Sequence, residues 1–251
     1  MHRFFVHKNC INCETAALPG TVSRQLYQVL RCRPGDKIIL LDNSGMEYHL
    51  KLENVNPKRV TGIVTKIEKG KGDPKTRITL YQAILKSDKF EFVLQKGTEL
   101  GVSDFVPTLC SRSIPTLNNN NWSKNRQSRC LKIISEATEQ CGRSVMPILR
   151  NPIDFWSACA HAEGFKLILS EYEHKTSLKK ALTELNNVEN YHNTQTSVFV
   201  GPEGGFTQNE IDHARTRNIA TASLGNRTLR AETAGIAAVT SILYEFQDLD
   251  P

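Results

Sequence analysis

The chain has 251 residues, which is room for one large domain or for two of modest size. Hydrophobic residues make up 39% of the chain, enough for a core, and no apolar run approaches the length needed to span a membrane. The 32 basic side chains exceed the 26 acidic ones, so the formal net charge is +6. This composition excludes a membrane-spanning protein.

The start of the chain and its cysteines indicate a cytoplasmic protein. No charged and apolar signal segment precedes the first expected strand, so the protein should stay where it is made. Seven irregularly spaced cysteines are typical of reduced thiols in a cytosol. Cys10 and Cys13 have metal-ligand spacing, but no second pair completes a tetrahedral site. We therefore expect no metal.

The positive charge is concentrated in the first third of the chain. Residues 1–75 hold 13 Lys and Arg against 7 Asp and Glu, whereas residues 76–251 hold 19 of each kind. A basic module joined to a neutral one is typical of a polyanion-binding domain attached to a catalytic body. A generally solvated basic surface would show the same excess, so charge alone leaves both interpretations open.

The same third has the pattern of a small β-barrel with one helix. Strands are predicted over residues 37–41, 47–53 and 59–68. Asp42-Asn43-Ser44-Gly45 is a good hairpin turn between the first two. A short helix is predicted over residues 23–30 and should end before Pro34-Gly35.

A change of pattern predicts a second domain. Lys66–Lys75 is charged, contains two glycines and a proline, and is interpreted as a linker between domains 1–70 and 76–251. Strands and helices then alternate, which predicts a parallel sheet covered by helices on both faces. The expected strands lie near 77–84, 104–109, 166–170, 197–201 and 219–224, and the expected helices near 88–100, 124–141, 176–186, 208–216 and 230–246.

Residues 111–128 interrupt this alternation. The stretch contains four consecutive asparagines, which predict a mobile loop. Arg112, Trp122 and Arg126 on such a loop could stack on an unpaired base. An ordinary surface loop would explain the same residues.

Two glycine-bearing loops near the end of the chain carry the strongest signal. VFVGPEGGF (198–206) and SLGNRTLRAETAG (223–235) each follow a short apolar strand. Side by side at the ends of parallel strands, they would form a cleft lined by backbone groups, a common place for a small-molecule site. GPEGG lacks the spacing and the lysine of a phosphate-binding loop, and its Glu203 would repel a pyrophosphate. A tight turn followed by a capping box at Thr207 and Glu210 would also explain the first loop.

These two segments resemble the C-terminal core of the SPOUT RNA methyltransferases, and more closely the RsmE family. HRFFV (2–6), QAILKSDKFEFVLQKGTELGV (82–102) and SEATEQCGR (135–143) are similar as well. The resemblance runs in order over nearly the whole chain. It implies an α/β fold: a SPOUT-type parallel sheet with a C-terminal trefoil knot, preceded by a small PUA-like RNA-binding β-barrel.

The family resemblance also implies a ligand and residues to hold it. Members bind S-adenosyl-L-methionine in the knot, mostly through backbone groups of three loops. The positions that correspond are Leu169, Ser170, Gly201, Pro202, Glu203, Gly204, Leu224, Gly225 and Leu229. Contacts with ribosomal RNA are expected from Arg3, Arg24, Arg31, Arg33, Arg112 and Arg126.

The implied reaction is methylation of N3 of a uridine in small-subunit (16S) ribosomal RNA. This nitrogen must lose a proton, and the charge that spreads onto O2 and O4 needs a donor. Arg230 is the candidate donor, although an ion pair with Glu232 or Glu203 would also explain it. Glu139 is the candidate base, although a helical pair with Arg143 is an alternative, as is a reaction without a protein base.

The resemblance further implies a homodimer that packs through the last helix. Two other functions stay open from the sequence. One is a SPOUT methyltransferase with another target, such as a ribose 2′-hydroxyl or a transfer-RNA base, against which the HRFFV and EQCGR segments argue. The other is a non-catalytic RNA-binding protein, against which the intact glycines at 201, 204, 205 and 225 argue.

Overall fold

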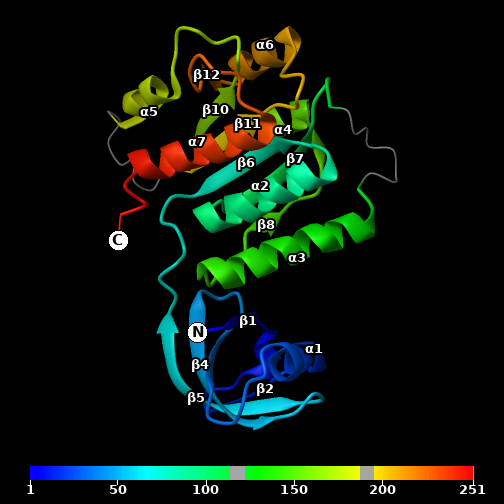
Figure 1. The fold of residues 1–251 in the computed structure, drawn as a ribbon. Helices are drawn as coiled ribbons and strands as arrows, with labels where there is room; N and C mark the ends of the chain where they lie inside the picture. Colours follow the sequence, from blue (N-terminus) through cyan, green and yellow to red (C-terminus); the bar gives the residue numbers. More distant parts are fainter. Residues whose placement is uncertain (114–121, 187–194, 251) are drawn as a thin grey trace. The chain divides into compact units, whose positions relative to one another are not determined.

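The computed structural model describes residues 1–113, 122–186 and 195–250 (Figure 1). The chain forms two compact units. The first comprises Met1–Asp73 and Ser135–Met146, and the second comprises Pro74–Ile134 and Pro147–Pro251. The first break therefore falls in the expected linker. Residues 135–146, in contrast, cluster with the N-terminal unit, which differs from the continuous second domain expected over 76–251.

A five-stranded sheet forms the N-terminal unit. Its strands stand in the order β1-β3-β4-β5-β2, and only the β1–β3 pair is parallel. Their bounds are β1 (Arg3–Phe5), β2 (Thr15–Ala17), β3 (Lys37–Leu41), β4 (Met46–Val55) and β5 (Val60–Lys69). The hairpin between β3 and β4 turns where expected, with positive φ at Asn43 and Gly45. Phe4, Leu26 and Leu50 are among the side chains that fill its core.

The helical part of this unit differs from the expected helix over 23–30. A short α1 (Gly20–Arg24) continues directly into a π-helical turn (Gln25–Val29), and a 3₁₀ turn (Lys8–Cys10) follows β1. Leu26 is fully buried, so the segment packs its apolar side onto the sheet. A π-helical turn contains one residue more than an α-helical turn, and the hydrophobic periodicity of the sequence does not predict this local change.

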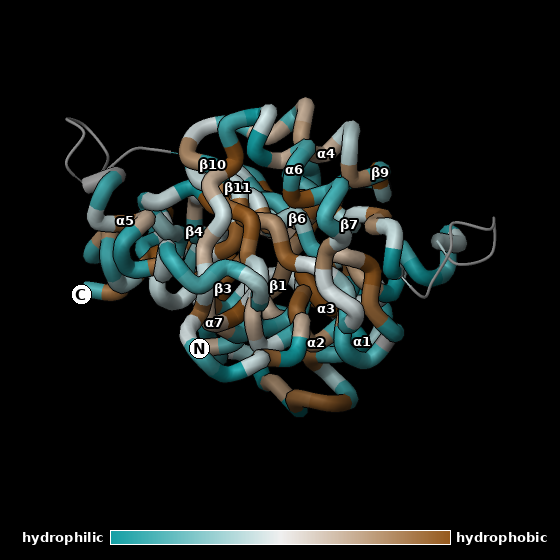
Figure 2. The backbone as a smooth tube through the Cα atoms, turned by 90° about the horizontal axis from the view of Figure 1, so that it is seen from above, coloured by the Kyte–Doolittle hydropathy of each residue, from teal (hydrophilic) through white to brown (hydrophobic). Residues whose placement is uncertain are grey.

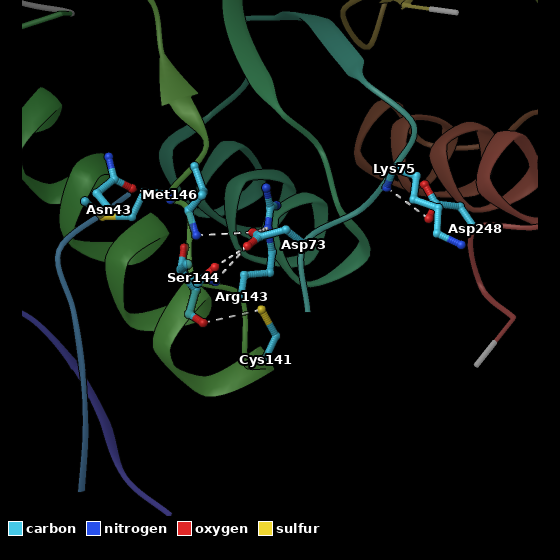
Figure 3. Close-up of polar contacts among 10 residues, drawn as sticks. Asn43, Asp73, Lys75, Cys141, Arg143, Ser144, Met146 and Asp248 are labelled. Atoms are coloured by element: carbon cyan, nitrogen blue, oxygen red, sulfur yellow. Dashed lines mark hydrogen bonds and ion pairs between the residues drawn. The ribbon is translucent and has the colours of Figure 1, made fainter. Parts of the chain in front are cut away.

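The break between the two units falls inside Lys66–Lys75, at Asp73 and Pro74, but the residues on both sides of the break are held by hydrogen bonds. The first four residues of this segment belong to β5, which pairs with β4 as far as Met46↔Lys69. Asp73 is then fixed by Ser144 and Val145, whose backbone N–H groups donate to its carboxylate, and by an ion pair with Arg143 (Figure 3). Beyond it, the carboxylate of Asp248 accepts from the backbone N–H groups of Lys75 and Thr76.

A parallel sheet forms the centre of the second unit. The order is β12-β10-β11-β6-β7-β8, with β9 also pairing with β7, and the neighbouring strands pair in parallel. The strands are β6 (Ile78–Ala83), β7 (Asp104–Leu109), β8 (Ile148–Leu149), β9 (Ile153–Asp154), β10 (Phe165–Leu169), β11 (Thr196–Val200) and β12 (Ala220–Ala222). All six residues of β6 and all five of β11 are buried, which is typical of strands covered on both faces. Figure 2 shows the hydrophobic residues along β11.

Helices alternate with the strands of this sheet along the chain. They are α2 (Ser87–Leu100), α3 (Lys124–Cys141), α4 (Phe155–His161), α5 (Leu178–Asn186), α6 (Gln208–Thr216) and α7 (Ala231–Glu245). α7 packs on α2 and on β6 and β11, while α4 packs on α6 and β7 (Figure 1). The expected strands and helices all form, with small differences in bounds. α4 was not predicted; its first turn is capped by Asp154, which accepts from the Ser157 N–H.

Candidate functional site

A cavity of about 460 Å³ opens at one edge of the parallel sheet. It is formed where β10, β11 and β12 end, because the carboxyl ends of parallel strands meet at the same edge. The loop after β10 contributes Leu169–Tyr172, the loop after β11 contributes residues from Val200 to Phe206, and the third wall runs from Ser223 to Ala231. The two glycine-bearing loops thus lie together, as their sequences predicted.

Glycine conformation shapes two of these walls. Gly205 has φ of +68° and donates its N–H to the carbonyl of Pro202, which closes a tight turn in GPEGG. Gly225 has φ of +104°, and a Cβ at this position would meet nothing within 4 Å. Glycine is therefore favoured at position 225 because of its positive φ, and not because a side chain would clash with neighbouring atoms. Both residues line the cavity.

The structure brings together most of the residues expected around a cofactor. Of the nine, those that line the cavity are Leu169, Ser170, Gly201, Pro202, Glu203, Leu224, Gly225 and Leu229. Gly204 is not part of this lining; its carbonyl accepts from Nη1 of Arg112 at 2.8 Å. The capping box at Thr207 and Glu210 is also present, so these two residues have a structural role at the start of α6.

Arg230 lies on the wall of the cavity. It is the N-cap residue of α7, is exposed and contributes to the lining. Within residues 1–113, 122–186 and 195–250 its guanidinium forms no ion pair, so the expected alternative of a pair with Glu203 or Glu232 is not observed. Both carboxylates instead face Lys89 of α2, at 3.1 and 3.9 Å from its Nζ.

Glu139 has a different environment. It lies in the part of α3 that clusters with the N-terminal unit, and its Oε1 accepts from the backbone N–H of Phe5 at 2.8 Å. Burial raises the pKa of its carboxyl above the ordinary value of 4.5, and the Phe5 hydrogen bond opposes that rise. The described lining of the cavity does not include Glu139.

The arginines expected to contact RNA fall into two groups. Arg24, Arg31 and Arg33 are exposed on the N-terminal unit, whereas Arg3 is partly buried and lies 3.5 Å from Glu47. Arg126 is held inside the second unit: its Nη2 donates to the carbonyl of Leu85. Its guanidinium also lies over the rings of Trp122 and Phe90, at 5.3 and 5.8 Å from the centroids.

Residues 114–121 of the expected loop, including the four asparagines, lie outside the described residues. Trp122 is not a free stacking platform, because it packs edge-on against Phe90 with ring centroids 5.8 Å apart. The Arg112 side chain, in contrast, is exposed beside the GPEGG turn.

Sequence reasoning missed a second, smaller cavity of about 250 Å³. It shares Ser170, Tyr172 and Phe206 with the first and adds Arg112 and Arg215. Tyr172 is 67% exposed. Only the meeting of the loop after β10 with α6 brings these residues together, and no spacing in the sequence signals it.

Comparison with known proteins gives this arrangement a family. Residues 72–243 match the RNA methyltransferase domain family, and residues 18–65 match the RNA methyltransferase PUA domain family. The chain belongs to the RNA methyltransferase family that includes ribosomal RNA small subunit methyltransferase E. A member from Mesomycoplasma hyopneumoniae is 32% identical, with 98% of this chain and 100% of the relative covered. A member from Bacillus subtilis is 28% identical, with 98% and 97% covered.

Solved structures of the family share the fold over the full length. Ribosomal RNA small subunit methyltransferase E from Neisseria gonorrhoeae, bound to S-adenosyl methionine, has a TM-score of 0.84, 29% identity and 97% coverage of both chains. The methyltransferase Lpg2936 from Legionella pneumophila, also in complex with this cofactor, has a TM-score of 0.84, 28% identity and 96% coverage of both chains. In the described part of the chain, no helix has the length and apolar character required to cross a membrane.

Proposed function

We propose that this protein transfers a methyl group from S-adenosyl-L-methionine to N3 of a uridine in small-subunit ribosomal RNA. The observation that carries the proposal is the cavity built by three loops at the strand ends in a member of this family. Its relatives are named as small-subunit methyltransferases, and two similar structures hold the cofactor. The assembled subunit in the cytoplasm is the proposed substrate.

The cavity suits this cofactor in size and chemistry. A volume of about 460 Å³ falls within the range of small-molecule sites. Backbone groups near Gly201 and Leu224–Gly225 would hold the polar edges of the ligand, and Leu169, Leu224 and Leu229 would provide apolar walls. The lining holds the carboxylates of Glu171 and Glu203 and the guanidinium groups of Arg227 and Arg230, which suits a ligand that carries charges of both signs. When bound, the cofactor supplies a methyl group already activated on a sulfonium.

The protein's own task is then to deprotonate and orient the uracil. Loss of the N3 proton leaves negative charge on O2 and O4, and a positioned cation lowers the energy of that charge. Arg230 is suited to this role, because its guanidinium lies at the cavity and is not bound to a carboxylate among the described residues. Arg3, Arg24, Arg31, Arg33, Arg112 and Arg126 remain candidates for RNA contacts.

Three finer features belong to the same proposal. The order β12-β10-β11, in which the chain leaves β11 and returns on the far side of β10, supports a trefoil knot. The five-stranded sheet of the N-terminal unit supports a PUA-like barrel that binds RNA. The small residues of α7 and its exposed Tyr244 support a homodimer interface on that helix.

Methyl transfer to small ribosomal subunits that lack their N3-methyluridine tests the proposal. The subunits are incubated with labelled S-adenosylmethionine, and the product nucleoside is identified by mass spectrometry. N3-methyluridine is the expected product. A different methylated nucleoside would assign another target to the same fold, and no transfer together with no cofactor binding would leave an RNA-binding protein.

A further inference from the structure

A polar cluster lies beside the cavity at the first turn of α7. Nζ of Lys89, on α2, lies 3.1 Å from Oε1 of Glu203 and 3.9 Å from Oε2 of Glu232. Glu203 belongs to the GPEGG loop, and Glu232 is the second residue of α7. The Lys89 and Glu203 side chains are 27% and 28% exposed, whereas Glu232 is 12% exposed. Lys89 is therefore the cation shared by a cavity-lining loop and the helix that follows Arg230.

Two polar groups in this cluster have unused hydrogen-bonding capacity. Oε2 of Glu232 is buried without a hydrogen-bond partner among the described residues, since its distance to Lys89 exceeds hydrogen-bonding range. Both polar side-chain atoms of Gln82 are buried and without a partner as well, and this residue is only 1% exposed. Such groups are costly in a folded protein and are normally satisfied by a ligand or by water.

The side chain of Gln82 reaches the same part of α7. Side chains alternate along a strand, and Gln82 projects from the face of β6 that α7 covers. A Cβ on Gly235 would lie only 2.9 Å from Oε1 of Gln82. Gly235 follows Glu232 by three residues, so the carboxamide and the carboxylate meet the same side of the helix one turn apart.

We propose that Lys89, Glu232 and Arg230 bind the imide edge of the target uracil, and that Glu232 accepts its N3 proton. This inference rests on the methyltransferase function proposed above and assigns the residues that select the base. Lys89 would donate to one carbonyl oxygen, Arg230 would donate to the other, and the Glu232 carboxylate between them would accept from N3–H. Glu203 holds Lys89 in place.

The pattern distinguishes uracil from cytosine. Uracil presents an acceptor, a donor and an acceptor at O4, N3–H and O2, which matches a cation, a carboxylate and a cation. Cytosine presents an amino donor at N4 and an unprotonated acceptor at N3. It would place its amino group against one of the two cations and its ring nitrogen against Glu232, leaving both protein groups unpaired. Unpaired buried groups are a strong source of discrimination.

These groups account for every proton and electron pair in the methyl transfer. The N3–H bond breaks, its electron pair stays on N3, and the proton passes to the carboxylate of Glu232. The N3–CH₃ bond forms as the S–CH₃ bond of the methyl donor breaks, with that electron pair returning to sulfur. Lys89 and Arg230 stabilise the charge on the carbonyl oxygens during this exchange, and Glu232 then releases its proton to water. This inference places the base at Glu232 and not at Glu139, whose Oε1 accepts from the Phe5 N–H.

The test compares three isosteric or near-isosteric variants. Glu232→Gln removes the proton acceptor, Lys89→Met removes the cation, and Lys89→Arg restores a cation. Glu99→Gln is the matched control, because it breaks the Lys96–Glu99 surface ion pair at 2.8 Å on the same helix as Lys89. Each variant is assayed for kcat against pH with small ribosomal subunits, and for S-adenosylmethionine affinity by calorimetry. Binding is also compared for RNA fragments carrying uridine or cytidine at the methylated position.

We expect Glu232→Gln to lower kcat by about 10²–10⁴-fold with unchanged cofactor affinity. Its rate should rise in proportion to hydroxide, because the imide must then ionise without help, and it should lose the preference for uridine-containing RNA. Lys89→Met should lower kcat by about 10²-fold, and Lys89→Arg should recover part of this loss. Glu99→Gln should match the wild type.

An unchanged kcat in Glu232→Gln, or an unchanged pH profile and base preference despite a lower kcat, would overturn the assignment. Loss of cofactor binding in this variant would also overturn it, because Glu232 would then be a structural residue. The proposed function fails separately, and takes this inference with it, if the wild-type protein does not produce N3-methyluridine.

Discussion

The two units of this protein use different means to prepare a binding site. The N-terminal unit carries three candidate RNA contacts as exposed guanidinium side chains, with Arg24 at the end of α1 and Arg31 and Arg33 in the segment before β3. In the second unit, the cavity is shaped by the backbone of loops at the ends of parallel strands. Each exposed cation adds a small part of the RNA affinity, and one such cation can replace another. A cavity shaped by the backbone loses affinity for its ligand when a single residue that sets the backbone conformation is changed. The units should therefore respond to substitution in different ways.

The largest expected effect concerns the stability of the N-terminal unit. Asp73 accepts from the N–H groups of Ser144 and Val145 and from the Ser144 hydroxyl, and it pairs with Arg143 (Figure 3). Asp73→Ala leaves these buried or half-buried donors unsatisfied and should cost about 3 kcal/mol or more. Urea unfolding measures this loss. Asp36→Ala, which removes an exposed acceptor for the Arg33 N–H, should cost much less. Equal losses would contradict the argument.

Substitution of the proposed catalytic cation, Arg230, should lower activity without lowering stability. Arg230→Met removes the guanidinium at the cavity, and kcat should fall by about 10²–10³-fold. The free energy of unfolding should change by less than about 0.5 kcal/mol, because the guanidinium forms no ion pair in the described structure. Steady-state methyl transfer and thermal unfolding measure the two quantities. A stable variant with full activity would remove Arg230 from the mechanism.

Two glycines provide a matched comparison between the units. Gly225 and Gly35 both have φ near +100°, and a Cβ on either would meet nothing within 4 Å. Replacement by alanine should therefore strain both alike, by about 1 kcal/mol. Only Gly225→Ala should also weaken S-adenosylmethionine binding, by about tenfold or more, because Gly225 lines the cavity. Calorimetric titration of both variants checks this, and equal affinities would place the cofactor elsewhere.

The pH dependence of stability should reveal the half-buried carboxyl of Glu139. Burial raises the pKa of this carboxyl in the folded state, so folding favours its protonated form. Its contribution to stability is present below the ordinary value of 4.5 and is lost as pH rises through the higher folded pKa. Glu139→Gln should therefore gain stability relative to the wild type as pH rises from about 4.5 upward. Unfolding curves at several pH values test the sign, and a fall would contradict it.

The smallest effects should come from single exposed arginines of the N-terminal unit. Arg33→Ala should weaken RNA binding only a few-fold and reduce the slope of log affinity against log salt by about 0.7–0.9. Cofactor affinity should not change. Filter binding at several salt concentrations measures the slope. An unchanged slope would show that Arg33 is only solvated, and the same measurement applies to Arg24.

Local signals in the sequence were sufficient for most secondary structure. The predicted helix bounds 124–141 and 208–216 are those of α3 and α6, and the predicted strand 104–109 is β7. These predictions used amphipathic periodicity, a capping box at Thr207 and apolar runs. Such signals depend only on residues close together in the chain, so they can be recognised from the sequence alone. The two glycine loops and Arg230 were found for the same reason, and the family resemblance supplied their cofactor.

Long-range pairing explains what the sequence did not reveal. Lys66–Lys69 looks like a linker, but its register with β4 makes it a strand. Glu139 is the predicted base, and its Oε1 accepts from the N–H of Phe5, which lies 134 positions away. Arg126 was expected on a loop, but it lies in α3, where its guanidinium packs over the rings of Phe90 and Trp122. Each of these roles depends on a partner that composition and spacing cannot identify.

The sequence by itself determined the alternation of strands and helices, the basic N-terminal third and the glycine loops that line the cavity, because each is encoded by neighbouring residues. Only the tertiary structure decided which charged groups meet at α7. Lys89 from α2, Glu203 from the loop after β11 and Glu232 from α7 are separated by up to 143 positions and converge because parallel strands place their ends at one edge. These three residues therefore form a candidate binding site for the target uracil beside the cofactor cavity.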